Sequence, residues 1–434
     1  MKLKLVVASM SVLGLLSCPA FAATTTTPAP TPTHHKKVHH HHHHHNVVVT
    51  HYTEAEVIPA HTVPVAVETE PKVDIFQSIL DNMDHNTGRA KPMPDWFNRI
   101  GVSGGVNADV KWGNRRIFYT TENVKLLAIN DAYVNFSATV NDWAKAFASL
   151  NFANPSTNYS YATPTSNNTI NLEQGYVTLG NLDVYPVFLQ VGKQFQDFGR
   201  YTLHPLNRTL AQSLSESLQT SVDLGFITRM GLHGSVYVFS NPATVGNPGG
   251  QTGNVYGAAL GFDRPGDQVG FDVGVGYMSN MSGVGDVNNF LSTNMVHLVG
   301  AIAAYGDVNS GPFTLGARYS TAIQSFSPTD INTSLGLPLG TGSGARPWAA
   351  DITGGYSYNL WAKNQNIYLG YQATNNAARL MLPKYRILAG LGVDMWKNTT
   401  VGLEYTHDNA YSSGNGGSGN SSNTLGLRAA LKFG

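Results

Sequence analysis

Apolar residues alternate with polar or small residues in sixteen stretches between residues 99 and 434, and this pattern strongly restricts the fold. In the first stretch Val106, Val110 and Trp112 share one parity, while Asp109 and Lys111 share the other. Because successive side chains of a strand point to opposite faces, each stretch predicts a strand with one apolar and one polar face. The stretches are 99–112, 131–140, 143–153, 172–180, 186–195, 220–228, 231–240, 255–263, 269–279, 296–305, 312–321, 348–360, 366–374, 384–395, 399–408 and 424–433.

The number and length of the stretches favour a membrane barrel. Most of them match the roughly 9–11 residues that a tilted strand needs to cross a membrane. Inside lipid every backbone amide needs a partner and no sheet edge can stay open, so strands that span a membrane close into a barrel. The sequence therefore predicts an all-β fold, a 16-stranded antiparallel transmembrane β-barrel over residues 99–434. A secreted, soluble all-β lectin is the alternative.

The connections between the stretches are alternately short and long, as in outer-membrane barrels. The short connections, expected in the periplasm, are 141–142, 181–185, 229–230, 264–268, 306–311, 361–365 and 396–398. The long connections, expected outside the cell, are 113–130, 154–171, 196–219, 241–254, 280–295, 322–347, 375–383 and 409–423. An even number of strands then places both ends of the barrel in the periplasm.

The residues before the barrel divide into three segments. Residues 1–22 have a basic start, an apolar run and a small-residue site ending at Ala22, the pattern of a secretory signal peptide. A lipoprotein site ending at Cys18 is the alternative. Residues 23–72 are rich in Thr, Pro and His and predict a disordered periplasmic tether, and residues 73–98 predict a short amphipathic helix and a linker. The predicted location is the cell outer membrane of a Gram-negative bacterium, with the tether in the periplasm.

A run of seven histidines in the tether is a candidate metal-binding segment. Imidazoles in an unstructured segment bind Zn, Cu or Ni at neutral pH. The alternatives are a repetitive codon expansion or an inserted purification tag, and the additional His34, His35 and His51 argue against a tag. The candidate metal ligands are His39, His40, His41, His42, His43, His44 and His45.

Composition narrows the classes of partner and activity. The formal net charge is zero and 12% of the residues are charged, so nucleic acid is not an expected partner. The four histidines of the predicted barrel, His204, His233, His297 and His407, are dispersed and form no catalytic motif. We therefore expect neither an enzyme nor a resident cofactor. The sequence leaves the oligomeric state open.

The polar parity of the predicted strands carries charges of both signs, as a wet lumen requires. Its cations are Lys111, Lys145, Arg318, Lys384, Arg386, Arg428 and Lys432, and its anions are Asp109, Asp131, Asp272, Asp351, Asp394 and Glu404. A barrel of this size is wider than its side chains can fill, so selectivity requires a loop folded inward. Residues 196–219, with Arg200 and Arg208 among aromatic residues, are the candidate. The alternative is a surface loop whose arginines contact lipopolysaccharide phosphates. The candidate pore-lining and ligand residues are Arg200, Arg208, Arg318, Arg386, Arg428, Lys145, Asp109 and Asp351.

Short motifs around this loop resemble those of a known family. They are Tyr176-Val177-Thr178-Leu179-Gly180-Asn181-Leu182, Pro186-Val187, Gly192-Lys193-Gln194-Phe195, Phe198-Gly199, Ser213-Leu214-Ser215-Glu216 and Gly234-Ser235-Val236-Tyr237. Through them most of the region from Asp95 to Gly434 resembles the LbtU-type siderophore porins, named after the legiobactin receptor. The resemblance implies a plug-less sixteen-stranded outer-membrane barrel that imports an iron-loaded polycarboxylate siderophore. The histidine run, and an N-terminal coiled coil reduced to residues 75–83, depart from the family.

The favoured hypothesis is thus an outer-membrane porin or receptor that imports a ferric polycarboxylate siderophore through the barrel. A general or other-solute diffusion porin is the alternative, followed by a structural or adhesive surface barrel. The expected partners are a ferric siderophore or another small anionic solute, outer-membrane lipid and lipopolysaccharide, and the barrel-assembly machinery. In this hypothesis Arg200 and Arg208 of the loop, with Arg318, Arg386 and Arg428 of the wall, form a cationic path that pairs with carboxylates of the siderophore.

Overall fold

The computed structural model describes residues 100–114, 123–153, 169–201, 205–241, 244–245, 254–266, 268–292, 294–331 and 344–434. The signal peptide expected at 1–22, the tether at 23–72, the helix and linker at 73–98 and the histidine run from His39 to His45 all lie outside the described residues.

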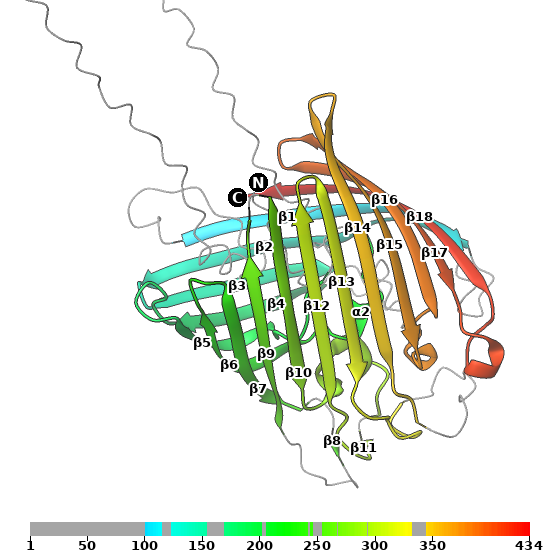
Figure 1. The fold of residues 1–434 in the computed structure, drawn as a ribbon, viewed down its shortest axis with the longest axis horizontal. Helices are drawn as coiled ribbons and strands as arrows, with labels where there is room; N and C mark the ends of the chain where they lie inside the picture. The colour runs from blue at the N-terminus through cyan, green and yellow to red at the C-terminus, as the bar shows by residue number, and fades with distance from the viewer. Residues whose placement is uncertain are drawn as a thin grey trace, which may run out of the picture. The chain divides into compact units, whose positions relative to one another are not determined.

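Sixteen antiparallel strands form one closed barrel (Figure 1). They are β1 (Ile100–Asn114), β2 (Asn123–Asn141), β3 (Ala144–Ala153), β4 (Thr169–Leu179), β5 (Val187–Phe195), β6 (Leu218–Ile227), β7 (Leu232–Ser240), β9 (Asn254–Arg264), β10 (Val269–Met278), β12 (Ala301–Ser310), β13 (Phe313–Ala322), β14 (Trp348–Leu360), β15 (Lys363–Asn375), β16 (Tyr385–Trp396), β17 (Thr399–Asn409) and β18 (Ser421–Phe433). The first and last strands, β1 and β18, pair and close the ring. The predicted fold class is therefore confirmed.

The strands keep the two faces that the sequence pattern predicts. Along β18, Leu425, Leu427 and Leu431 are exposed on the outside, whereas Thr424 and Arg428 are buried on the inside. This arrangement is the reverse of a soluble protein, because the apolar residues face outward and the charged residues face inward.

Short turns gather at one end of the barrel and long loops at the other, and we call these the turn end and the loop end. In Figure 1 the turns that join β12 to β13 and β14 to β15 are at the top. Short helical segments lie in the long loops: α2 (Leu210–Ser213), η4 (Met281–Gly283), α3 (Gly285–Asn288), η5 (Ala378–Leu380) and η6 (Ser413–Asn415). Two short strands of the loops, β8 (Thr244–Val245) and β11 (Asn294–Met295), pair in parallel apart from the barrel sheet. Among the described residues, no helix is long and apolar enough to cross a membrane.

Two strands differ from their predicted bounds by five residues or more. Strand β2 begins at Asn123 instead of 131, so residues 113–114 and 123–130 of the predicted loop belong to β1 and β2. Strand β12 covers Ala301–Ser310 instead of 296–305. The residues before it alternate in the sequence, but Met295 and Val299 are buried in an apolar cluster of the loops. The following turn is consequently at Gly311, where φ is +53°.

The inner wall combines aromatic rings with glycines that stand directly opposite them on the neighbouring strand. A Cβ atom on Gly257 would lie 2.2 Å from the Tyr237 ring, and one on Gly390 would lie 2.1 Å from the Tyr368 ring. The opposed pairs are Tyr133 with Gly105, Phe188 with Gly225, Tyr237 with Gly257, Tyr305 with Gly274 and Tyr368 with Gly390. These glycines let large rings lie against the wall.

An apolar cluster at the loop end fixes the long loops against one another. Phe198 and Leu214, from the connection after β5, pack in it with Met281 and Val284 of the connection after β10. Phe326, from the connection after β13, belongs to the same cluster. All five side chains are buried, so these connections form one packed unit with the barrel.

Candidate functional site

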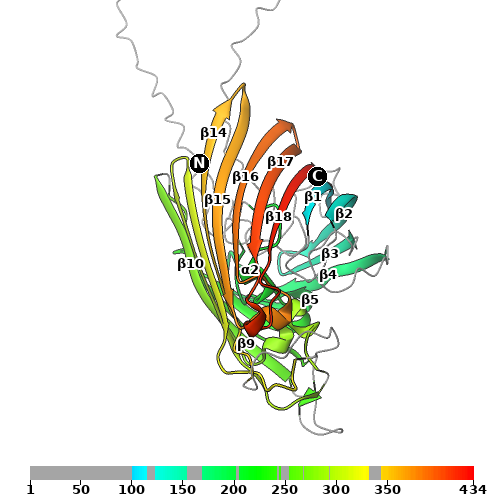
Figure 2. The same ribbon diagram turned by 90° about the vertical axis from the view of Figure 1, so that its right-hand side faces the viewer.

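Residues 196–217, between β5 and β6, fold into the barrel, and we call them the inward loop. Figures 1 and 2 both show helix α2 of this loop inside the ring of strands. The two ends of the loop meet, because the Gln196 N–H donates to the Ser217 carbonyl at 2.8 Å. Residues 202–204, including His204, lie outside the described residues. The position of the loop agrees with the inward segment that the sequence predicts at 196–219.

One anchor of the inward loop is a carboxylate on the facing wall. The Leu206 N–H and the Asn207 side-chain amide each donate to one oxygen of Glu404 on β17, both at 2.6 Å. The Tyr368 hydroxyl on β15 donates to the same carboxylate at 3.0 Å. From β1, the Lys111 ammonium donates to the Asn207 side-chain oxygen at 3.1 Å. Three strands therefore hold this part of the loop.

A second anchor receives the start of helix α2. The Leu210 N–H donates to the side-chain oxygen of Gln372 on β15 at 3.1 Å, and the Ala211 N–H donates to Asp351 on β14 at 3.2 Å. The first N–H groups of a helix have no partner within it, and both would otherwise be buried without one. Asp351, a predicted pore-lining residue, thus accepts from the loop backbone.

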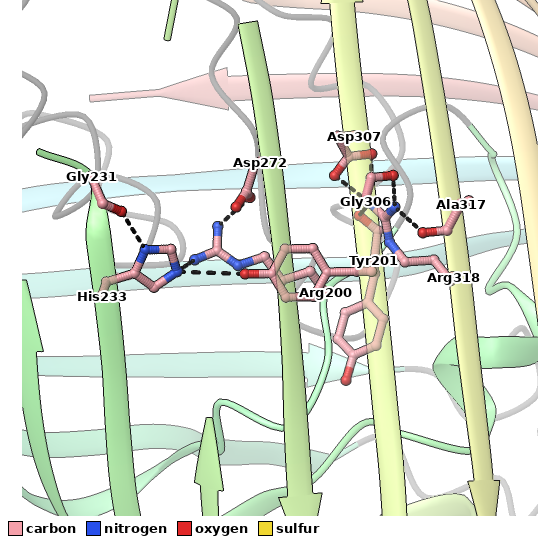
Figure 3. A network of polar contacts seen from close by, with 10 residues as sticks. Arg200, Tyr201, Gly231, His233, Asp272, Gly306, Asp307, Ala317 and Arg318 are labelled. Atoms are coloured by element: carbon pink, nitrogen blue, oxygen red, sulfur yellow. Dashed lines mark hydrogen bonds and ion pairs between the residues drawn. The ribbon is translucent and has the colours of Figure 1, made fainter. Parts of the chain in front are cut away.

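The root of the inward loop is fixed by Arg200, whose guanidinium lies in the polar network of Figure 3. It donates to Asp272 on β10 at 3.0 Å and to Nε2 of His233 on β7 at 3.0 Å. Because Arg200 can only donate, His233 Nε2 accepts, and the ring proton is on Nδ1, 3.1 Å from the Gly231 carbonyl. The same guanidinium lies over the Tyr305 ring, 5.2 Å from its centroid.

Two wall arginines join the strands to the loop. Arg318 on β13 donates to both oxygens of Asp307 on β12, at 2.9 and 2.8 Å. Arg386 on β16 makes a two-pronged pair with Asp408 on β17, at 2.6 and 3.1 Å. Each arginine also donates to a backbone carbonyl of the inward loop, at 3.2 Å for Arg318 and 3.0 Å for Arg386.

The two remaining predicted arginines are paired as well. Arg208 of the inward loop lies 3.0 Å from Glu216 and 3.3 Å from Asp286 of α3. Arg428 on β18 is paired with Asp109 on β1, the residue directly opposite it where the barrel closes.

These pairs correct the cationic path that the sequence analysis predicts. Arg200, Arg208, Arg318, Arg386 and Arg428 do lie in the barrel interior, but each contacts a carboxylate. A buried charge needs such a partner because transfer from water to the protein interior is costly. The arginines therefore link strands and loop and do not form a row of unpaired cations.

Lys145 is placed differently from the arginines. It shares the inward parity of β3 with Phe147 and Ser149, near the turn end, but its side chain is exposed. Of the other predicted interior charges, Lys384 and Lys432 are exposed, and the side chain of Asp131 lies outside the described residues.

The sequence analysis missed the partners that complete these pairs. Asp307 fell in a predicted turn because β12 was placed too early, and His233 was set aside as one of several dispersed histidines. Asp408 and Glu216 carried no local signal for their roles. The missed carboxylates lie either on the inward face of a strand or in a buried loop. With the correct bounds of β12, the alternation pattern would have placed Asp307 on the inward face.

The environment of the inward loop changes the acidity of Glu216. Burial raises the pKa of Glu216 from its ordinary 4.5 to about 8, although the Arg208 charge and a hydrogen bond from Gln212 oppose the change. The Gln212 amide donates to Glu216 at 2.6 Å. The packing of the loop therefore makes Glu216 a weaker acid than it is in the unfolded chain.

The part of the chain that the structure describes contains no group of three or more His, Cys, Asp and Glu side chains able to hold a metal ion. The candidate ligands His39 to His45 are not among these residues.

Comparison of sequences finds bacterial relatives of this chain, and no family model matches it. A UPF0422 protein of Legionella pneumophila is 26% identical over 331 residues, which are 72% of this chain and 59% of that protein. A UPF0422 protein of Coxiella burnetii is 25% identical over 330 residues, 74% of this chain and 66% of that protein. The chain thus spans less than two thirds of the length of these relatives.

Comparison of structures finds a porin whose barrel is similar to this one. An anion-selective porin from Comamonas acidovorans matches with a TM-score of 0.51 and 9% identity, covering 77% of this chain and 99% of that chain. At this identity the likeness concerns the barrel fold alone.

Proposed function

We propose that this protein is an outer-membrane channel of the porin type, without enzymatic activity. The observation that supports it best is the inward loop, which crosses the interior of a sixteen-stranded barrel and is bonded to the facing strands. A barrel of this size is wide enough to enclose an aqueous channel. A loop fixed inside it narrows the passage and sets which solutes cross.

The outer face supports a membrane location. Leu127, Ile170 and Leu369 are exposed by 80%, 73% and 68%, a distribution that only a lipid surface accommodates around a whole barrel. Trp361 and Trp396, in or beside turns at the turn end, are exposed by 83% and 66%, as expected for rings at a membrane interface. We infer that the turn end faces the periplasm, because short turns occupy that side in bacterial barrels.

Import of a ferric polycarboxylate siderophore is a second, narrower candidate. It is favoured by the position of the motifs that resemble LbtU-type porins, since Gly192 to Phe195 and Phe198-Gly199 form the end of β5 and the root of the inward loop. A polycarboxylate would have to compete with the carboxylates that already contact the five interior arginines. The siderophore hypothesis therefore depends on the resemblance more than on the site.

Replacing residues 198–215 by a short Gly-Ser linker tests the proposed channel. The contact between Gln196 and Ser217 keeps the loop ends adjacent, so a short linker can join them without displacing β5 or β6. We expect the purified wild-type protein to conduct ions in planar bilayers, and the linker variant to conduct more per channel. Absence of conductance from folded wild-type protein would contradict the proposal, and equal conductance of both proteins would contradict the role of the loop.

Uptake into liposomes that contain wild-type protein or the linker variant distinguishes a general channel from a siderophore importer. Uptake of a ferric citrate-type chelate is compared with uptake of a neutral sugar of similar size. Preferential uptake of the chelate by wild-type protein supports the siderophore hypothesis, and preferential uptake of the sugar argues against it while leaving the channel in place.

A further inference from the structure

The buried charged side chains of this protein have a surplus of carboxylates. Among the described residues, eleven Asp and Glu side chains are buried, against five Lys and Arg side chains. The positive charges of Arg200, Arg318, Arg386 and Arg428 are compensated, because each faces a carboxylate. The electrostatic character of the passage therefore depends on the carboxylates that face no cation.

Oxygen atoms without a donor lie along the wall formed by β5, β6 and β7. Asp223 on β6 is buried, and its Oδ1 atom has no hydrogen-bond partner among the described residues. Gln196, at the start of the inward loop, is also buried, and its Nε2 donates to Ser221 at 2.8 Å. Its Oε1 atom likewise has no partner in the described part of the chain. Asp197 is half-buried and accepts a long hydrogen bond, 3.5 Å, from Ser235.

Strand register places these groups in one region of the wall. Asp223 follows Ser221 on the same face of β6, and it stands directly opposite Tyr237 on β7. Ser235 precedes Tyr237 on the same face of β7. Gln196, bonded to Ser221, and Asp197, bonded to Ser235, are therefore both held close to Asp223. We call Gln196, Asp197 and Asp223 the acceptor patch.

Unpaired acceptors of this kind attract a positively charged solute. A buried carboxylate oxygen without a donor has lost its hydration without replacement, and this loss destabilises the site. An alkali cation or an ammonium group supplies the missing partner. Acidic side chains that line a passage favour cations, and binding shared among several weak contacts still allows the ion to leave.

We propose that the acceptor patch is a cation subsite of the passage, so that the channel favours K⁺, Na⁺ and small organic ammonium ions over anions. This inference rests on the proposed channel function. The cationic path predicted from the sequence would favour anions, whereas the acceptor patch favours cations. The inference therefore predicts poor entry of polycarboxylate chelates.

Two nearby cations act against this preference, and neither removes it. Arg200 follows the acceptor patch in the inward loop and its charge acts on Asp197, but its guanidinium donates to Asp272 and His233 (Figure 3). Lys145 is exposed near the turn end of β3, on a wall separated from β6 by β4 and β5.

Reversal potentials in planar bilayers under a KCl gradient test the cation subsite. Wild-type protein is compared with the double variant Asp197→Asn and Asp223→Asn, in which amides replace the carboxylates at nearly the same volume. The matched control is the double variant Asp142→Asn and Asp183→Asn, whose carboxylates are exposed in or beside turns. Methylammonium chloride, used in place of KCl, extends the measurement to an organic cation.

We expect wild-type protein and the control to pass K⁺ in preference to Cl⁻, and the ratio of K⁺ to Cl⁻ permeability to fall about threefold in the double variant. Because Asp197 is half-buried, Asp197→Asn alone should fold normally and show a smaller fall in the same direction. A wild-type channel that prefers Cl⁻ or has no preference would overturn the inference. So would a permeability ratio that is the same in wild-type protein, in Asp197→Asn and in the double variant Asp197→Asn and Asp223→Asn. Complete absence of conductance in the wild type would instead contradict the proposed channel function.

Discussion

Replacing Glu404 with Ala is expected to detach the middle of the inward loop while the barrel stays closed. The carboxylate accepts from Leu206 and Asn207 of the loop at 2.6 Å each, and from Tyr368 at 3.0 Å. On its two neighbouring strands Glu404 stands directly opposite Gly390 and Gly426, so the strand pairing does not depend on its side chain.

The size of the effect follows from the two bonds to the loop. A hydrogen bond to a charged group contributes about 1.5–3 kcal/mol, so the loss of both weakens this anchor by roughly 3–6 kcal/mol. Since every 1.4 kcal/mol is a factor of ten, the fraction of molecules with a released loop should rise by about two to four orders of magnitude. The anchor at Gln372 and Asp351 remains and keeps the released state in the minority.

Limited trypsin digestion of the folded protein measures this fraction through cleavage after Arg208. In the anchored loop the Arg208 carbonyl accepts from Arg386 at 3.0 Å, and cleavage requires the loop to open. When opening and closing are fast, the cleavage rate follows the open population. The matched control is Asp394→Ala. This substitution also removes a carboxylate, but one that accepts from Thr400 of the neighbouring strand, at 3.0 Å, and not from the inward loop. Equal cleavage rates after Arg208 in wild-type and Glu404→Ala protein, both heat-modifiable on gels, would refute the anchoring role.

The same loop and the last strand supply further predictions. Glu216 has a pKa of about 8 in the folded loop and an ordinary value of 4.5. Between pH 4.5 and 8 the folded loop therefore binds a proton that the unfolded chain has released. The stability of the folded loop consequently falls as the pH rises from about 5 to 8. Cleavage after Arg208, normalised to that of the denatured chain, should increase over this range in wild-type protein and stay flat in Glu216→Gln; a decrease in the wild type would contradict the assignment. Phe433 is 52% exposed on the outer face of β18 and lies against Gly104. We expect the last strand, which ends at Phe433 and Gly434, to be the signal that the barrel-assembly machinery recognises. Phe433→Asp should then accumulate as protease-sensitive, unassembled protein, and an unchanged outer-membrane yield would exclude this role.

Local patterns in the sequence were sufficient to predict the barrel. Each of the sixteen predicted stretches overlaps a strand of the closed ring, because alternation with a period of two is a property of neighbouring residues in one segment. The inward position of the loop after β5 was also expected, since a wide barrel needs a constriction. The bounds of β12 were wrong because the residues before Ala301 alternate as a strand would, yet they pack in the cluster that contains Val299.

The candidate site was predicted in its residue types but not in its pairing. Arg428 and Asp109 are 319 positions apart in the chain and meet because the last strand closes on the first. Likewise, Arg200 reaches His233 and Asp272 because the inward loop turns back along strands that follow it in the sequence. From the sequence alone the interior arginines appear free to bind an anionic solute, whereas in the structure each contacts a carboxylate.

The sequence by itself determined the strands, their two faces and the alternation of short and long connections, because lipid outside and water inside impose a local pattern on every strand. The tertiary structure decided which charges compensate one another and which acceptor atoms, such as Asp223 Oδ1, have no donor among the described residues. The physical reason is that charge pairing depends on distances of a few ångströms between residues of different strands, and only the register and the path of the inward loop set these distances.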